Sequence, residues 1–131
     1  MSFLIDLTCY DEDDGKLGVF ETNIIPDFCI NRVFYIFDVP GDKQRADHAC
    51  MNSRIVLIAI AGSVSISMEI DGTTTKYILD HKSKALFVPA GSWIRAYDFS
   101  SESILLGLSE LTYDDCVYVD DYSEHKSIIK G

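Results

Sequence analysis

Residues 32–67 read RVFYIFDVPGDKQRADHACMNSRIVLIAIAGSVSIS, two apolar, strand-like segments joined by a polar hinge. The first, residues 32–39, is aromatic and β-branched and ends at Pro40-Gly41, which predicts a strand followed by a turn. The second is residues 54–60. On the far side of the hinge lies His48, the only histidine placed beside an apolar run that could become a pocket wall. If the protein performs chemistry, we expect it here. The neighbours of His48 in this stretch are Tyr35, Arg45, Asp47 and Cys50.

Short strand signals continue on both sides of this stretch. Residues 63–70 alternate apolar and polar side chains, and Asp71-Gly72 then predicts a two-residue hairpin turn leading into residues 73–79. The other expected strands are residues 3–8, 16–21, 85–88, 93–99, 104–108 and 117–119, with residues 122–130 as a short tail. No apolar pattern of period 3.6 is sustained for ten residues. The pattern predicts an all-β, antiparallel sandwich or barrel, and the length predicts one domain over residues 1–131.

Composition excludes several classes of partner. The net charge of −10 argues against nonspecific binding to nucleic acid or to an anionic membrane, although two local arginines suffice for a phosphorylated small molecule. The longest apolar run, residues 55–61, is too short to cross a bilayer, and the N-terminus lacks the basic flank of a signal peptide. We therefore expect a cytoplasmic protein. Its four cysteines have no metal-binding spacing, which predicts reduced thiols and no zinc site.

The spacing of glycines and histidine resembles the first and second motifs of the cupins, a jelly-roll family. Gly41, His48, Gly62 and Pro89-Ala90-Gly91 stand near the expected places. The other metal ligands of the family are replaced by Cys50, by Arg54 or Ile55, and by Ile94. One imidazole and one thiol are too few for a catalytic metal, which needs three or more protein ligands, so we expect no metal and no other cofactor.

Further motifs resemble one cupin subgroup along nearly the whole chain. They are KLGVFE at 16–21, INRVFYIFDVP at 30–40, Arg45-x-x-His48-Ala49, Asp71-Gly72, Val88-Pro89, Trp93, YDFS at 97–100, Tyr113-Asp114 and Asp121-Tyr122. Together they resemble the metal-free dTDP-sugar 3,4-ketoisomerases, often labelled WxcM-like. The resemblance implies an antiparallel jelly-roll (cupin) barrel. It also implies conversion of dTDP-4-keto-6-deoxyglucose into a 3-keto-6-deoxyhexose, on which an aminotransferase would act in glycan or O-antigen assembly.

One departure from the subgroup falls inside the proposed pocket. The family pattern Arg-Gly-x-His-Ala-His-Lys reads here RADHACM, at residues 45–51. The first family histidine maps to His48, while the second maps to Cys50. Cys50 is two residues further along a strand and would point the same way as His48, as a weak proton relay or as a small apolar filler.

Moving the ketone from C4 to C3 requires a proton to leave C3 and a proton to reach C4. An imidazole with a pKa of about 6.5 suits both transfers, so His48 is the candidate base, against the alternative of a hydrogen-bonded structural histidine. Tyr35 is a candidate to donate its phenol to the enediolate or to the nucleotide, or is simply an amphipathic strand aromatic.

The candidate substrate-binding residues each have a plain structural alternative. Arg45, Arg95 and Arg32 suit a pyrophosphate, or lie on a solvated face. Glu21 is a candidate for a sugar hydroxyl or a solvated residue, and Trp93 or Tyr97 for stacking on thymine or for the core.

Three hypotheses follow from the sequence. The first is the active isomerase, expected as a homodimer with strand exchange near residues 3–8. The second is a catalytically lapsed dTDP-sugar-binding partner of an active isomerase, motivated by the Cys50-Met51 substitution. The third is a module that only assembles with other proteins.

Overall fold

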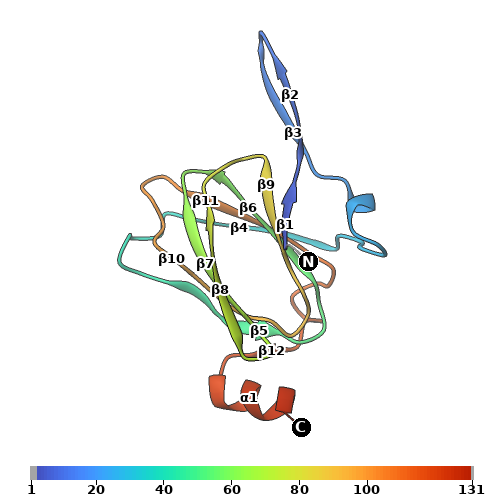
Figure 1. Cartoon of the computed structure of the whole chain (residues 1–131), viewed down its shortest axis with the longest axis vertical. Coiled ribbons are helices and arrows are strands. Elements are labelled where there is room, and N and C mark those ends of the chain that lie inside the picture. The colour runs from blue at the N-terminus through green and yellow to red at the C-terminus, as the bar shows by residue number, and fades with distance from the viewer. Residues whose placement is uncertain (1–2, 131) are drawn as a thin grey trace.

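The computed structural model describes residues 3–130 and contains two five-stranded antiparallel sheets packed face to face (Figure 1). The first sheet has the strand order β1 (Leu4–Asp6), β9 (Lys84–Val88), β6 (Ile55–Ala61), β11 (Ile104–Ser109), β4 (Arg32–Phe37). The second has the order β12 (Tyr118–Val119), β5 (Arg45–Cys50), β10 (Trp93–Tyr97), β7 (Val64–Ile70), β8 (Thr73–Leu79). Apart from the β7–β8 hairpin, neighbours in each sheet are far apart in the sequence, and the expected jelly-roll barrel is confirmed.

The core lies between the inner faces of the two sheets. Leu57 and Leu105 from the first sheet, and Ile66 and Ile94 from the second, are each at most 5% exposed and belong to one apolar cluster. Burial of these side chains supplies the main driving force for closing the barrel. The Asp71-Gly72 turn is confirmed, because Ile70 pairs with Thr73 across it and both turn residues adopt the positive φ that such a turn needs.

A separate two-stranded hairpin projects from the barrel (Figure 1). It consists of β2 (Thr8–Glu12) and β3 (Gly15–Val19), with Asp13 and Asp14 in the turn between them. A 3₁₀ turn, Thr22–Ile24, follows the hairpin. Arg54 holds the next loop by donating to the backbone oxygens of Pro26 and Asp27, and it forms an ion pair with Glu110 at 2.7 Å.

The C-terminal segment predicted as a tail is the helix α1 (Tyr122–Lys130), and that prediction was wrong. Asp121 caps the helix by accepting a hydrogen bond from the backbone N–H of Glu124, 3.1 Å away. His125, 1% exposed, anchors the helix to the barrel through Nε2 and the carbonyl oxygen of Gly91, 2.7 Å apart. Its ring also lies 5.3 Å from that of Trp93. Tertiary contacts of this kind stabilise a helix too short to persist alone.

Candidate active site

A β-bulge in β5 sets the geometry of the site. Ile94 and Ala96 on strand β10 pair with His48 and Arg45 on β5. The two β10 residues are two positions apart and the two β5 residues are three apart, so β5 contains one extra residue. Ala46 absorbs the extra residue with φ of 57°, in the left-handed region. As a result Arg45, Ala46 and His48 all line one cavity, whereas Asp47 lies on the opposite face, where it accepts a hydrogen bond from Trp93 Nε1 at 2.9 Å.

This hollow, the His48 cavity, has a volume of about 270 Å³ between the two sheets. Its floor is apolar, made by core side chains that include Leu57, Ile66 and Ile94. The polar groups at its wall come from distant parts of the chain: Arg32, Arg45, His48 and Tyr118. An apolar pocket with a few convergent polar groups is the usual form of a small-molecule site.

His48 is half-buried, and its Nδ1 atom is buried with no hydrogen-bond partner among the described residues. Burial lowers the pKa of His48 below its usual value of 6.5, although Asp47 and Asp120 partly oppose this. The imidazole is therefore uncharged at neutral pH and has a free lone pair for a proton. This is the state that a general base requires.

Tyr118 was not among the residues predicted from the sequence, yet it is the closest aromatic partner of His48. The two ring centroids are 4.9 Å apart. The Tyr118 hydroxyl accepts a hydrogen bond from Arg32 Nη1 at 2.7 Å. Burial raises the pKa of Tyr118 even though Arg32 opposes the change, so the phenol keeps its proton at neutral pH. Arg32 donates to the phenol oxygen, so the Tyr118 hydroxyl keeps its own proton for donation, and the Cys116 thiol beside it also raises the pKa of this phenol.

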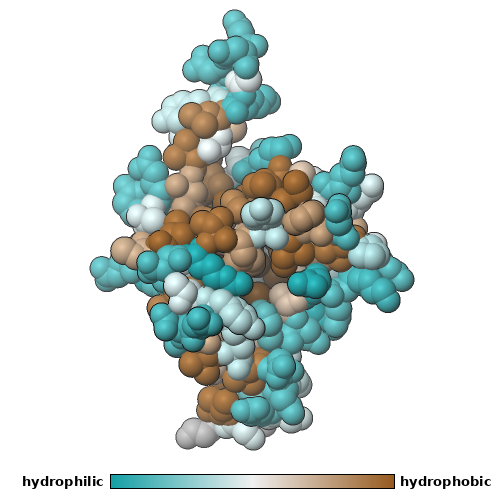
Figure 2. Space-filling model, turned by 180° about the vertical axis from the view of Figure 1, so that it is seen from behind, coloured by the Kyte–Doolittle hydropathy of each residue, from teal (hydrophilic) through white to brown (hydrophobic). Residues whose placement is uncertain are grey.

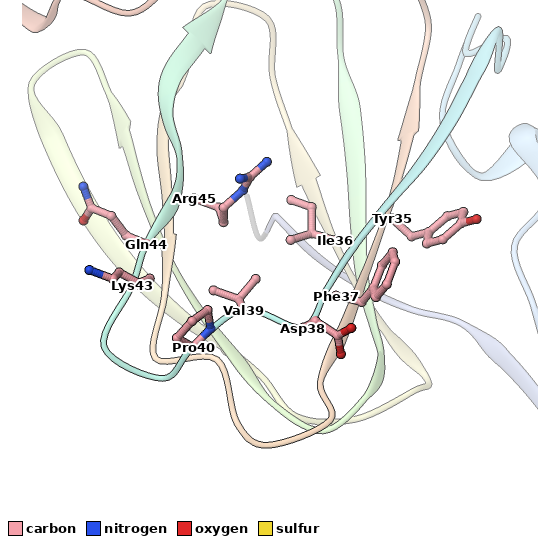
Figure 3. Close-up of a pocket in the computed structure, with 9 residues that line it drawn as sticks. All are labelled: Tyr35, Ile36, Phe37, Asp38, Val39, Pro40, Lys43, Gln44 and Arg45. Atoms are coloured by element: carbon pink, nitrogen blue, oxygen red, sulfur yellow. The ribbon is translucent and has the colours of Figure 1, made fainter.

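A second hollow, the mouth hollow, adjoins the cavity and has a volume of about 510 Å³ (Figure 3). The two share Tyr35, Ile36 and Arg45. Lys43 and Arg45 give the mouth hollow two cations, opposite a single carboxylate from Asp38. In Figure 3 the Arg45 guanidinium points toward Ile36, and both residues border both hollows, so Arg45 stands at their junction.

The structure gives neither Tyr35 nor Cys50 the role expected from the sequence, although Tyr35 borders both hollows and Cys50 borders neither. The Tyr35 ring is 63% exposed, stacks on Phe37 at 5.8 Å and points away from Arg45 (Figure 3). Side chains alternate along β4, so the inward positions belong to Phe34 and Ile36, which flank Tyr35. Cys50 is buried beyond the cavity wall, where its Sγ contacts Cys116 Sγ at 2.7 Å. Burial raises the pKa of Cys50 to about 11, which favours the filler interpretation over the proton relay.

Three further candidates lie on the opposite face of the second sheet. Trp93, Arg95 and Tyr97 alternate with the inward-facing Ile94 along β10, so they face away from His48. Trp93 and Arg95 line a separate polar hollow of about 290 Å³ beneath helix α1. Tyr97 instead lies 5.6 Å from Lys76 Nζ. Glu21 is exposed at the start of the 3₁₀ turn and lines neither the His48 cavity nor the mouth hollow.

Residues 3–130 contain neither a metal-binding cluster nor a helix suited to crossing a membrane. No three histidine, cysteine, aspartate or glutamate side chains in this range are grouped so that they could hold a metal ion. Within the same range, no helix has the length and apolar character needed to cross a membrane.

Comparison with known proteins gives one consistent result. The family model of FdtA, described as WxcM-like, C-terminal, matches residues 2–130. The chain is 31% identical over 115 residues to a TDP-4-oxo-6-deoxy-α-D-glucose-3,4-oxoisomerase of Aneurinibacillus thermoaerophilus, covering 88% of this chain and 83% of that protein.

Solved structures agree with this match. A 3,4-ketoisomerase from Helicobacter canadensis superimposes with a TM-score of 0.92 at 28% identity, covering 98% of this chain and 96% of that one. A histidine-to-asparagine mutant of the 3,4-ketoisomerase QdtA from Thermoanaerobacterium thermosaccharolyticum, in complex with TDP-4-keto-6-deoxyglucose, has a TM-score of 0.91 at 30% identity. That match covers 97% of this chain and 92% of the QdtA chain.

Proposed function

This chain belongs to the FdtA (WxcM-like, C-terminal) family, and we propose that it is a 3,4-ketoisomerase acting on dTDP-4-keto-6-deoxyglucose. The product is a dTDP-3-keto-6-deoxyhexose. One observation carries the mechanism: an uncharged His48 with an unpaired, buried nitrogen stands in a cavity large enough for a hexose.

His48 is the acid and base of the proposed reaction. It removes the proton on C3, which the neighbouring C4 ketone makes acidic, and the electron pair moves to form an enediol between C3 and C4. His48 then returns a proton to C4, and the ketone forms at C3. The electrons stay within the sugar, so the step needs no external oxidant or reductant. General acid–base catalysis of this kind is worth roughly 10²–10⁴-fold in rate.

A second proton must pass from the oxygen on C3 to the oxygen on C4. Tyr118 replaces Tyr35 and Cys50 as our candidate for this relay, because its hydroxyl lies in the cavity beside His48 and remains protonated. Arg32 holds that hydroxyl in place through the 2.7 Å hydrogen bond. Arg32 also packs over the rings of Phe34 and Tyr113, which fixes its own orientation.

The nucleotide is assigned to the mouth hollow. Its neighbour, the His48 cavity, suits the hexose, and Arg45 at their junction suits the pyrophosphate that links sugar and nucleoside. Lys43 adds a second cation nearby. A local positive site of this kind is needed because the protein as a whole carries a net charge of −10. Trp93, Arg95, Tyr97 and Glu21 are not part of the proposed site.

A homodimer is also proposed. Val33, Tyr35 and Phe37 on the edge strand β4 are 55–63% exposed on the outer face of the first sheet. Hydrophobic side chains also gather on the barrel below the projecting hairpin (Figure 2). Such a face is typical of an interface, and the hairpin is free to reach a second copy. Light scattering should give twice the mass of one chain; the mass of a single chain would contradict the dimer. The cytoplasmic location stays a prediction.

Deuterium incorporation tests the function. The purified protein, given dTDP-4-keto-6-deoxyglucose in D₂O, should form the 3-keto product with deuterium on C4. Through the reverse reaction it should also place deuterium on C3 of the remaining 4-keto sugar, and NMR detects both. His48→Asn should lower the rate at least about 100-fold while leaving the fold intact. His81→Asn is the matched control, because the His81 side chain is exposed, hydrogen-bonds to Ser83 and lies outside the lining of the His48 cavity, and the variant should react at the wild-type rate.

The remaining outcomes would each overturn the proposal. Binding of dTDP without any exchange by the wild-type protein would support the lapsed partner instead. No binding of dTDP would support the assembly module. Full activity of His48→Asn would remove His48 from the mechanism.

A further inference from the structure

Two cysteines that the proposed chemistry does not use are in direct contact. Cys50 at the end of β5 and Cys116 in the loop before β12 have Sγ atoms 2.7 Å apart, although 66 residues separate them in the sequence. Both are buried, 6% and 9% exposed, within the apolar cluster between the sheets. A disulfide has an S–S length of about 2.05 Å, so the two sulfurs need to approach only slightly to form a bond.

Backbone contacts hold the two cysteines in this position. The N–H of Met51, next to Cys50, donates to the Val117 carbonyl oxygen at 2.8 Å. Asn52 spans the same gap: its side-chain oxygen accepts from the N–H of Val117, and its amide nitrogen donates to the carbonyl oxygen of Asp115. Because three hydrogen bonds already fix the segment around Cys116 to the end of β5, a covalent bond would not require rearrangement of the backbone.

We propose that Cys50 and Cys116 form a reversible intrachain disulfide under mild oxidation, with glutathione disulfide or another small disulfide as the oxidant. The thiolate of Cys116, the more exposed of the two, attacks the small disulfide, forms a mixed disulfide and releases one reduced thiol. Cys50 then attacks the Cys116 sulfur and releases the second. Two protein thiols lose two electrons and two protons, and one small disulfide becomes two thiols.

Proximity makes the second step fast despite the low acidity of Cys50. Burial raises the pKa of Cys50 to about 11, so its thiolate is scarce at neutral pH. A partner held in contact nevertheless reacts as though it were at very high concentration, which compensates for the small thiolate fraction. In a reducing compartment such a pair is a transient, redox-responsive bond rather than a permanent staple.

The bond would act on the wall of the His48 cavity. Cys116 lies two residues before Tyr118, which pairs with Cys50 across β12 and β5. The disulfide would therefore tie β5, which carries His48, to the loop that leads directly into β12 and Tyr118. We expect the oxidised protein to unfold at a higher temperature than the reduced protein, because the bond closes a long loop in the unfolded chain.

The test uses the full chain carrying Cys9→Ser and Cys29→Ser, since both of these cysteines are exposed and would otherwise react. The protein is incubated overnight with glutathione disulfide in mildly alkaline buffer, then unfolded in urea near neutral pH with an excess of a maleimide and weighed intact. We expect a product about 2 Da lighter than the reduced chain, with no maleimide attached, that dithiothreitol converts back. Adding Cys116→Ser should abolish that product.

Three results would overturn the proposal. They are two maleimides on the oxidised protein, a glutathione adduct that never resolves, or a bond between two chains. None of them depends on isomerase activity, so failure of this inference is distinguishable from failure of the proposed function.

Discussion

Gly107 on β11 lies directly beneath the ring of Phe34, and replacing it by alanine tests how closely the cavity wall is packed. A Cβ at this position would lie 2.1 Å from Phe34 Cζ, whereas ordinary contact begins at 3.4 Å. The ring would have to move by more than 1 Å, although it lines the His48 cavity and packs against the Arg32 guanidinium. Overpacking of this kind costs about 1–3 kcal/mol.

The sign of the effect should reverse when the ring is removed. A Phe34→Ala background removes the three atoms nearest to the new methyl group. Gly107→Ala should then raise the free energy of unfolding by about 0.5–1 kcal/mol, because glycine loses more backbone entropy on folding than alanine. Urea unfolding of the two single variants and the double variant gives the coupling, which we expect at about 1.5–4 kcal/mol. Gly18→Ala is the control, because Gly18 has nothing within 4 Å, and it should not destabilise the protein. Equal effects of Gly107→Ala in both backgrounds would refute the packing.

Three other predictions concern the bulge, the ion pair and the cavity wall. Ala46→Gly should raise the free energy of unfolding by about 0.5–1 kcal/mol in urea titrations, because φ of 57° strains alanine but not glycine; a loss of stability would contradict this. Glu110→Gln should cost about 1 kcal/mol at neutral pH by weakening the pair with Arg54. The Arg54 hydrogen bonds hold the pKa of Glu110 below its usual value. The stabilisation is therefore present above the unfolded pKa of about 4.3 and should disappear as pH falls through the lower, folded pKa. A stability difference between Glu110→Gln and the wild type that persists in acid would exclude the charge as its cause. Tyr118→Phe should lower kcat by about 10-fold or more with little change in KM for the keto sugar, and an unchanged kcat would remove Tyr118 from the relay.

The barrel strands with the clearest local patterns were predictable from sequence. Residues 63–70 alternate strictly, and Asp71-Gly72 has the backbone freedom that a tight hairpin needs, so β7, β8 and their turn follow from local sequence alone. Strand β5 has no such pattern, because its residues RADHAC are mostly polar and the bulge at Ala46 breaks the alternation. The sequence therefore predicts a polar hinge where the structure has strand β5.

Helix α1 was missed although a local signal existed. Asp121 followed three residues later by Glu124 matches the capping pattern of a helix start. The apolar periodicity after it is too short to stand out, and the helix depends on contacts with Trp93 and Gly91 that sequence cannot reveal.

The candidate site was predictable only in part. The sequence motif around His48 predicts a pocket residue, and His48 lines a cavity in the structure. Arg45 lines the same cavity because the bulge in β5 turns both side chains inward. Period-two alternation could have excluded Arg95: once Ile94 is placed at the third-histidine position, its neighbour must face the other way. Tyr118 could not be foreseen, because its contact with His48 arises from the pairing of β12 with β5 across a long sequence separation.

A crystal structure of the His48→Asn protein soaked with dTDP-4-keto-6-deoxyglucose would test the central claim most directly. We predict that the hexose occupies the His48 cavity, with C3 within about 4 Å of the side chain at position 48 and the pyrophosphate beside Arg45. A hexose bound instead on the opposite face, near Arg95 and Trp93, or with C3 turned away from position 48, would contradict the claim that this imidazole moves the proton.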